Sequence, residues 1–332
     1  MEITSGKIIT NETNVNARGG TELMAKRLHE SIDQKILEDY QIIFSRMRTL
    51  DPTKIRLYLA HDLEGDPEAD NALSNEGWKR FHKIIFVSNH QMQNYIHHYN
   101  IPFSHCLVMA NAVEPALPMQ KPKDVINIGY WSTPHRGLNI LVPVYKKLCE
   151  EFDNIHLDVF SSFKIYGWEE RDSQFAELIQ LCTDDSRISY HGSVSYSELR
   201  SALAKIHILG FPSTWVETSC MVLMEAMTHG MLAVHSNLGA LYETGAKWTA
   251  MYQYSENPQE HAERFYNQLR TAIINVNNPV VQSRLVAQKT FADVFYSWQL
   301  RQDEWKNLLV NGFVGVDRSL HEEKPSFRIK TS

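Results

Sequence analysis

The sequence predicts an α/β protein built from two doubly wound domains that face each other across a cleft. Short apolar segments rich in β-branched residues alternate with helical patterns along nearly the whole chain. A proline-rich stretch interrupts this alternation near residues 115–122. The chain has 332 residues, of which 43% are hydrophobic and 22% charged, so it is long and apolar enough to bury a core in each of two domains.

Nine segments are predicted to be strands because they are short and apolar, and helical patterns fall between many of them. The strand segments are 41–45, 55–60, 83–88, 106–110, 125–131, 155–161, 187–192, 206–211 and 231–236. The helical patterns are 21–33, 89–98, 138–151, 173–182, 196–204 and 218–229, followed by two long ones at about 258–275 and 280–310. Strands that alternate with helices form parallel sheets covered on both faces, so each domain is expected to be Rossmann-like.

The domain boundary is expected at the lysine- and proline-rich stretch near residues 121–124. We therefore predict a first Rossmann-like domain over 1–120 and a second over 121–295. The last stretch, 317–332, is polar and charged, and we expect it to form a flexible tail.

Composition excludes several classes of partner and compartment. The net charge is −6 and no long basic run occurs, which argues against nucleic acid as a main partner. The four cysteines are widely spaced and form no CxxC pair, so we expect reduced, buried thiols and a cytoplasmic protein. No apolar run approaches the ~20 residues that span a bilayer, so no transmembrane segment is expected, and peripheral attachment to a membrane is left open.

Open parallel sheets bind ligands beyond the carboxyl ends of their strands, so the segments after strands hold the candidate site residues. Gly19 and Gly20 precede a helix, where backbone amides can approach a phosphate, or they form an ordinary glycine turn. His61 follows a strand directly and can donate a hydrogen bond or take a proton, although a capping role in the loop is the alternative. Arg136 opens a helix and suits a diphosphate, whereas the alternative is a surface arginine.

Two glutamates, Glu217 and Glu225, lie in an otherwise apolar stretch that runs from a strand end into a helical pattern. On one helix they would be ~12 Å apart with an angular separation of about 80°. That span suits the hexose and the ribose of a nucleotide sugar, whose hydroxyls donate to carboxylates, with the helix N-terminus between them for the pyrophosphate. Thr218 or Ser219 is expected to cap the helix. The alternative, two solvated glutamates on an amphipathic helix, fits the apolar neighbours poorly.

These residues together resemble the family-4 retaining glycosyltransferases, which have the GT-B fold. The segment FPSTWVETSCMVLMEAMTHG (211–230) carries the family's pair of glutamates eight residues apart, and NLGALYE (237–243) resembles the loop that follows it. IGYWSTPHRGLNIL (128–141), NAVEP (111–115) and the glycine doublet resemble three further family motifs. The resemblance also implies that a closing helix, 296–316, packs back onto the first domain.

The resemblance implies a role for each matching position. Glu217 would contact the donor sugar, Glu225 would hold the ribose hydroxyls, and Arg136 would neutralise the leaving diphosphate. His61 would lie on the sugar and acceptor side. The remaining donor-binding groups would be Gly19 and Gly20, the amides of Thr218, Ser219 and Cys220, and Gly192, Ser193 and Val194 near the base. The chain departs from the family where Tyr130 replaces a second arginine and Thr218-Ser219-Cys220 replaces Gly-Phe-Gly.

The resemblance implies a retaining transferase that moves a hexose to a hydroxyl of a glycan or glycoconjugate without a metal or other cofactor. GDP-mannose is the first choice of donor. The alternatives are a UDP-sugar donor, a non-catalytic nucleotide-sugar-binding relative, an epimerase or phosphorylase of the same fold, and a periplasmic sugar-binding protein. A homodimer is left open, because the apolar residues Trp298, Leu300 and Trp305 suit either core packing or an interface, with core packing favoured.

Overall fold

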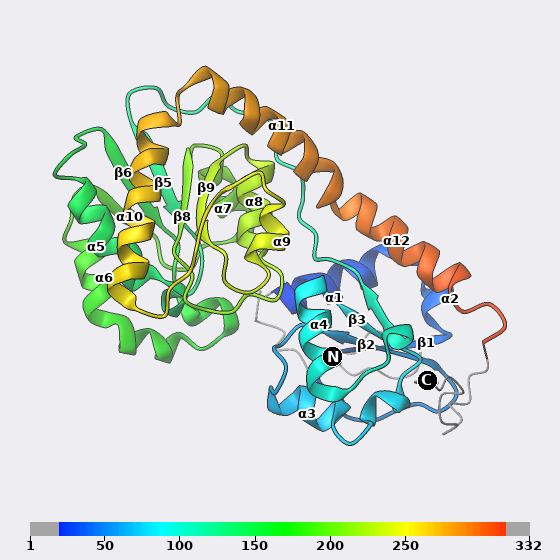
Figure 1. Ribbon diagram of the computed structural model, residues 1–332. Coiled ribbons are helices and arrows are strands. Elements are labelled where there is room, and N and C mark those ends of the chain that lie inside the picture. Colours follow the sequence, from blue (N-terminus) through cyan, green and yellow to red (C-terminus); the bar gives the residue numbers. More distant parts are fainter. Residues whose placement is uncertain (1–19, 317–332) are drawn as a thin grey trace, which may run out of the picture.

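The computed structural model of the chain describes residues 20–316, and these residues form the predicted α/β architecture with two parallel sheets (Figure 1). Gly19 and the expected tail, 317–332, lie outside the described residues. Each sheet carries helices on both faces, and the two sheet domains lie side by side with a long pair of helices running from one to the other.

The first domain contains a four-stranded sheet of order β1-β2-β3-β4, in which every neighbouring pair is parallel. Its strands are β1 (Tyr40–Phe44), β2 (Ile55–Ala60), β3 (Lys83–Phe86) and β4 (Cys106–Val108), and its helices are α1 (Gly20–Ser31), α2 (Gln34–Leu37), α3 (Pro67–Leu73) and α4 (Asn89–Tyr99). The residues of β1 are all buried, as expected for a strand of a parallel sheet covered on both faces.

The second domain contains a six-stranded parallel sheet of order β10-β9-β8-β5-β6-β7. Its strands are β5 (Ile126–Tyr130), β6 (Ile155–Val159), β7 (Ile188–Tyr190), β8 (Ile208–Phe211), β9 (Leu232–Ser236) and β10 (Ala250–Tyr252). Its helices are α5 (Leu138–Leu148), α6 (Ala176–Thr183), α7 (Tyr196–Leu203), α8 (Met221–Thr228), α9 (Leu241–Gly245) and α10 (Pro258–Asn275). From β5 the chain moves outward through β6 and β7, then returns to β8 on the other side of β5 and continues to β9 and β10. The strand order therefore reverses between β5 and β8.

The chain closes with two helices, α11 (Pro279–Phe295) and α12 (Trp298–Asn311), where the sequence predicted one helical stretch over 280–310. The break has a local cause, because the Ser297 side chain accepts a hydrogen bond from Leu300 N and starts a new helix. Ser297 also pairs with Val113 of the linker in an isolated bridge. Beyond the break, Trp305 of α12 is buried in the same cluster as β1 and β2 of the first domain.

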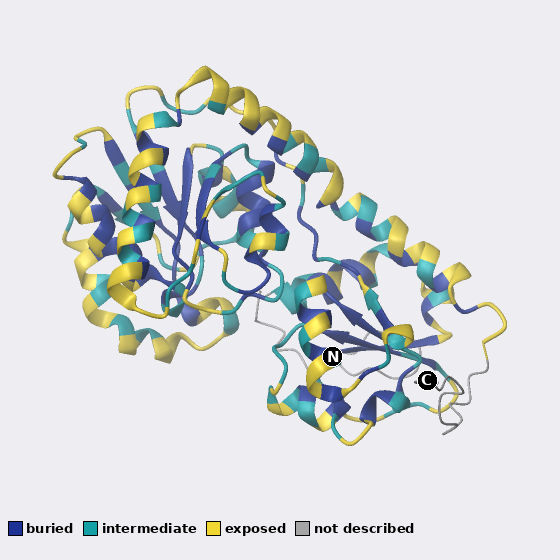
Figure 2. Ribbon diagram, viewed as in Figure 1, coloured by how far each residue is buried: buried dark blue, intermediate teal, exposed yellow. Residues whose placement is uncertain are grey.

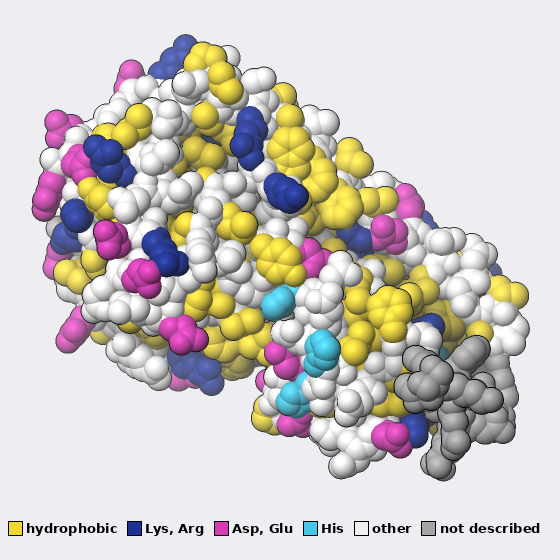
Figure 3. Space-filling view, viewed as in Figure 1, with side chains coloured by type: hydrophobic (Ala, Val, Ile, Leu, Met, Phe, Trp, Pro, Cys, Tyr) yellow, Lys and Arg dark blue, Asp and Glu magenta, His cyan; other side chains and the backbone are white. Residues whose placement is uncertain are grey.

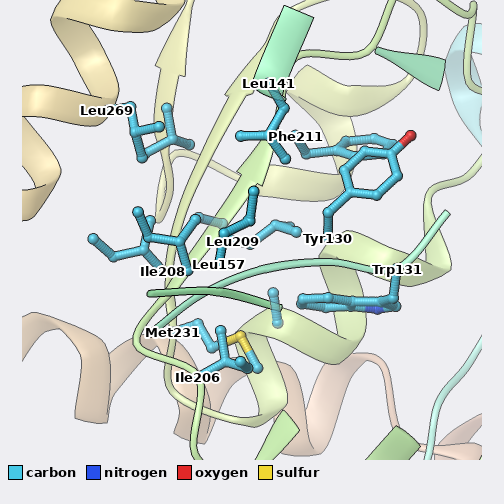
Figure 4. Close-up of a cluster of buried hydrophobic side chains, with 14 of the residues drawn as sticks. Tyr130, Trp131, Leu141, Leu157, Ile206, Ile208, Leu209, Phe211, Met231 and Leu269 are labelled. Carbon is cyan, nitrogen blue, oxygen red and sulfur yellow. The ribbon is translucent and has the colours of Figure 1, made fainter. Parts of the chain in front are cut away.

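The cores lie against the two sheets, as the buried residues in Figure 2 show. In the second domain, Phe211 of β8 and Tyr130 of β5 lie with ring centroids 6.0 Å apart, next to Leu141 of α5 (Figure 4). Tyr130, which stands where the family has an arginine, is fully buried, and its hydroxyl donates to Thr133 O at 2.8 Å. It belongs to the core.

Two expectations from composition can be compared with the described residues. The four cysteines are all buried and free, which confirms the prediction of buried thiols. Within residues 20–316, no helix combines the length and the apolarity that crossing a membrane requires.

Candidate functional site

The loops that follow β5 and β8 meet at the point where the strand order of the second sheet reverses. Such switch points are the ligand-binding edges of open parallel sheets. Gly137, at the end of the β5 loop, has φ +110°, and a Cβ there would lie 2.1 Å from the carbonyl oxygen of Pro212 in the β8 loop. Only glycine allows this close approach of the two loops.

An ion pair joins these two loops. Nη1 of Arg136 donates to both carboxylate oxygens of Glu217, at 2.8 and 2.9 Å. Burial lowers the pKa of Arg136, but Glu217, helped by the neighbouring side chains Tyr166, Cys220 and Tyr130, raises it by more in total, so the guanidinium stays charged. Arg136 Nε is buried and has no hydrogen-bond partner within the described residues. The arginine therefore keeps a donor available to an anion after it has paired with Glu217.

Glu217 is not part of the helix that carries Glu225. The predicted separation of ~12 Å assumed that both glutamates lie on one helix, so that prediction is wrong. α8 begins only at Met221, and Glu217 lies in an extended segment that pairs with Gly239. Ala240 N donates to Glu217 O at 2.7 Å. Gly239 has φ +62°, and a Cβ there would lie 2.6 Å from the backbone nitrogen and oxygen of Glu217. This close backbone pairing fixes the position from which the Glu217 side chain extends.

The N-terminus of α8 has no side-chain cap. The prediction that Thr218 or Ser219 caps this helix is therefore wrong. The residue at the cap position is Cys220, which is buried and makes no side-chain capping bond. Thr218 instead donates from Oγ1 to His61 O of the first domain at 3.0 Å. The start of α1 also faces this point, since a Cβ on Gly20 would lie 3.1 Å from the Sδ atom of Met221. The N-terminus of α8 and the first described residue of α1, one from each domain, therefore lie close together beside the Arg136–Glu217 pair, and the α8 N-terminus is a favourable setting for an anion.

Glu225, on α8, is buried and accepts a hydrogen bond of 2.9 Å from Trp131 Nε1. Trp131 belongs to the same loop after β5 that holds Arg136, so both glutamates contact this loop. Burial raises the pKa of Glu225. Hydrogen bonds from Trp131 and Tyr196 and nearby positive charges lower it, but by less in total, so the pKa stays above its usual value. The carboxylate is held in an unfavourable environment, which is typical of a group kept for binding.

Glu225→Gln is expected to raise the melting temperature of the ligand-free protein and to weaken donor binding about tenfold. Because burial raises the pKa of Glu225, ionising it at pH 7 costs free energy in the folded state, and an uncharged amide removes that cost while still accepting from Trp131. Thermal unfolding at pH 7.5 and calorimetric titration with UDP or GDP measure the two effects. A lower melting temperature with unchanged nucleotide affinity would contradict a binding role.

His61 lies directly after β2, at the border with the second domain. Its Nδ1 is 3.0 Å from Thr21 Oγ1 of α1, and its Nε2 is buried without a partner within the described residues. Burial lowers the pKa of His61 to about 4. The imidazole is therefore neutral at pH 7 and can donate or accept a hydrogen bond at the border between the domains.

The protein is expected to lose thermal stability as pH falls from about 6.5 to about 4. Burial lowers the pKa of both His61 and His235 to about 4, whereas an unfolded chain binds the proton near 6.5. The unfolded state thus holds more protons in this window, so the stabilisation is complete above pH 6.5 and is lost on acidification. Melting temperatures at pH 7.5, 5.5 and 4.5 test this, and a constant value across the series would contradict it.

The loop predicted to lie near the base, Gly192, Ser193 and Val194, follows β7 at the far edge of the sheet. In the sheet, β7 is next to neither β5 nor β8, the strands that precede Arg136 and Glu217. Val194 packs partly buried against the core of the second domain, and Ser193 is exposed. The loop thus lies on the β7 side of the switch point.

Three aromatic residues at the site were missed by sequence reasoning. Trp131 bonds to Glu225, Trp215 is half-exposed with the Arg136 guanidinium 5.9 Å from its ring centroid, and Tyr166 lies near the ion pair. Burial raises the pKa of Tyr166, and the charges of Arg136 and Glu217 act on it in opposite directions. The signal that could have found the first two is an aromatic residue placed just after a strand, since that position faces the ligand edge. Within residues 20–316, no three His, Cys, Asp or Glu side chains gather as a metal site.

Comparisons with known proteins agree with this geometry. Residues 114–269 match the model of the family described as "Glycosyl transferases group 1". A subunit of the phosphatidylinositol N-acetylglucosaminyltransferase of Arabidopsis thaliana is 24% identical over 167 residues, a match that covers 48% of this chain and 36% of the relative. This chain therefore matches only about a third of that relative's length.

Solved structures extend the similarity to most of the chain. A glycosyltransferase from Rickettsia africae ESF-5 superposes with a TM-score of 0.66 at 16% identity, covering 90% of this chain and 83% of the other. WaaG, a glycosyltransferase involved in lipopolysaccharide biosynthesis, gives 0.60 at 15% identity, with 82% and 78% covered. Anabaena Alr3699/HepE in complex with UDP and glucose gives 0.61 at 13% identity, with 88% and 76% covered. Likeness at this level of identity establishes a shared fold.

Proposed function

We propose that this chain transfers a sugar from a nucleoside diphosphate donor to a hydroxyl of a glycan or glycoconjugate. The premise is that residues 114–269 match the model of the group 1 glycosyl transferases and that the fold resembles solved glycosyltransferases. The observation that carries the proposal is the guanidinium of Arg136, which keeps a buried, unpaired Nε beside the open N-terminus of α8. A diphosphate satisfies both the arginine and the helix amides.

The mechanism follows from where charge develops. Glycosyl transfer passes through an oxocarbenium-like state while negative charge builds on the leaving diphosphate. Arg136 and the N-terminus of α8 are fixed before the reaction, so they stabilise that charge without reorganising. Glu217 accepts from sugar hydroxyls and Glu225 from ribose hydroxyls, which orients the donor. The acceptor hydroxyl attacks the anomeric carbon on the face that the diphosphate leaves. The bond from that carbon to the diphosphate oxygen breaks, and the leaving phosphate takes the hydroxyl proton, so configuration is retained without a metal.

Neutral His61 faces the acceptor side of this arrangement. Its unpaired Nε2 can accept a hydrogen bond from the incoming hydroxyl or donate one to the sugar. Because Thr218 of the second domain bonds to the His61 carbonyl, the imidazole is placed relative to the donor site by a direct contact between the domains.

The donor base is proposed from similar proteins. Anabaena Alr3699/HepE is described with UDP and glucose, the pneumococcal GtfA with UDP and GlcNAc, and the Arabidopsis relative as part of an N-acetylglucosaminyltransferase. These descriptions favour a UDP-sugar as the first donor to test. GDP-mannose, the first choice from the motif layout, stays a prediction and is the second donor in the test.

The experiment is a screen of UDP-GlcNAc, UDP-glucose and GDP-mannose by thermal shift and calorimetry. A ligand at a hundred times its Kd stabilises the folded form by about 2.7 kcal/mol, so the true donor raises the melting temperature clearly. Sugar alone and nucleoside alone serve as controls. If none of the three donors binds, the proposal fails, and if a donor binds but is neither hydrolysed nor transferred to any acceptor, the chain is a binding protein.

A further inference from the structure

One contact between the two domains is made by Glu243, a carboxylate to which the family motifs assign no role. Glu243, on α9, accepts hydrogen bonds from Asn89 N at 2.9 Å, Asn89 Nδ2 at 2.9 Å and His90 N at 3.0 Å. Asn89 and His90 begin α4 of the first domain. Tyr242 adds an edge contact to the His90 ring, with centroids 6.0 Å apart. Figure 3 shows histidine side chains near this border between the domains.

The contact completes the N-terminus of α4. The first backbone amides of a helix have no partner within the helix. Ser88 accepts from Gln91 N through its side chain, which leaves the amides of Asn89 and His90 to Glu243. A carboxylate at this end also interacts favourably with the helix dipole. The negative charge of Glu243 therefore stabilises the N-terminus of α4, whose first two amides donate to it.

α4 in turn holds the loop that carries His61. Gln91 Nε2 donates to Asp62 O at 2.8 Å, and the Tyr95 hydroxyl donates to the same oxygen at 3.0 Å. The neighbouring carbonyl, His61 O, accepts from Thr218 beside the donor site. The same loop is thus fixed from two directions, through α4 by Glu243 and directly by Thr218.

We propose that Glu243 is a positioning residue that holds the first domain closed over the donor site and so places His61 against the bound sugar. The proposal rests on the function proposed above. Glu243 belongs to the second domain and bonds to the α4 N-terminus of the first domain, whereas Arg136 and Glu217 both belong to the second domain and bond to each other. Loss of its carboxylate is therefore expected to weaken the contact between the domains while the nucleotide-binding groups of the second domain stay in place.

The variants Glu243→Ala and Glu243→Gln test the proposal, with Glu256→Ala as the control. Glu256 is an exposed glutamate of the second domain in the loop before α10, so its removal makes the same charge change. Gln keeps the size of the side chain but loses the charge, so a role in packing alone would leave Glu243→Gln like the parent protein.

Both Glu243 variants are expected to show a larger radius of gyration in ligand-free small-angle scattering than the parent and Glu256→Ala. Turnover of the donor found in the screen is expected to fall about tenfold in kcat, with the Kd of UDP or GDP changed less than about twofold. An unchanged radius of gyration in both variants overturns the proposal, as does parent-like behaviour of Glu243→Gln. Because the scattering needs no ligand, it decides this proposal even if no nucleotide sugar binds the parent.

Discussion

Arg136→Ala is expected to lower the rate constant for sugar transfer about 10²- to 10³-fold, the usual cost of removing one group that stabilises developing charge. The arginine is the cation at the meeting point of the β5 and β8 loops, where its Nε is buried and unpaired. Steady-state kinetics with the donor identified by the screen measure the effect. Arg136→Lys is expected to recover part of the rate, because lysine restores the charge but not the planar set of donors.

Two controls separate lost chemistry from lost folding. Removing the guanidinium leaves Glu217 as a buried carboxylate without its partner, which destabilises the fold, so unfolding must be measured alongside. The double variant Arg136→Ala with Glu217→Gln relieves the unpaired charge and is expected to regain stability without activity. Arg171→Ala removes an exposed arginine of the same domain and is expected to stay active. Parent-like turnover by Arg136→Ala would remove the arginine from the mechanism.

Gly137→Ala is expected to destabilise the protein by about 3 kcal/mol and to abolish donor binding. The backbone at this position has φ +110°, which side-chain-bearing residues rarely adopt, and the added Cβ would lie 2.1 Å from Pro212 O. The atom it meets is backbone, so the whole β8 loop has to move, and Glu217 moves with it. Urea unfolding followed by circular dichroism measures the stability, and calorimetry measures nucleotide binding.

Gly230→Ala is the matched control for this prediction. Gly230 also has a positive φ, +60°, but a Cβ there would meet only the side chain of Lys289 at 3.9 Å. Its replacement is expected to cost about 1 kcal/mol, the backbone strain alone, and to leave nucleotide binding intact. Equal losses in the two variants would show that the loop contact at Gly137 has no special importance.

The sheets could be predicted from the sequence because buried parallel strands are continuous apolar runs. β8, Ile208–Phe211, is wholly buried and falls within the predicted segment 206–211. The edge strand β10, Ala250–Tyr252, was not predicted because it has three residues and one exposed side chain, too few for a periodic signal. The helix break at Ser297 was missed because a serine inside a helical pattern gives no clear stop without knowledge of its capping bond.

The meeting of Arg136 and Glu217 could be predicted from the sequence, but the local geometry around them could not. Arg136 and Glu217 come from loops after different strands, and the rule that loops gather at the carboxyl edge of a parallel sheet predicts their meeting. The extended backbone at Glu217 depends on its pairing with Gly239, a contact between segments that no local pattern encodes. The bond from Trp131 to Glu225 depends on the packing of two elements 94 residues apart, which sequence alone does not specify.

The most direct test is a crystal structure of the protein grown with UDP, or with GDP if the screen selects a GDP-sugar. We predict diphosphate oxygens within hydrogen-bond distance of Arg136 and of the first amides of α8, with ribose hydroxyls on Glu225. A nucleotide bound elsewhere on the molecule, with the Arg136–Glu217 pair and Glu225 untouched, would contradict the account.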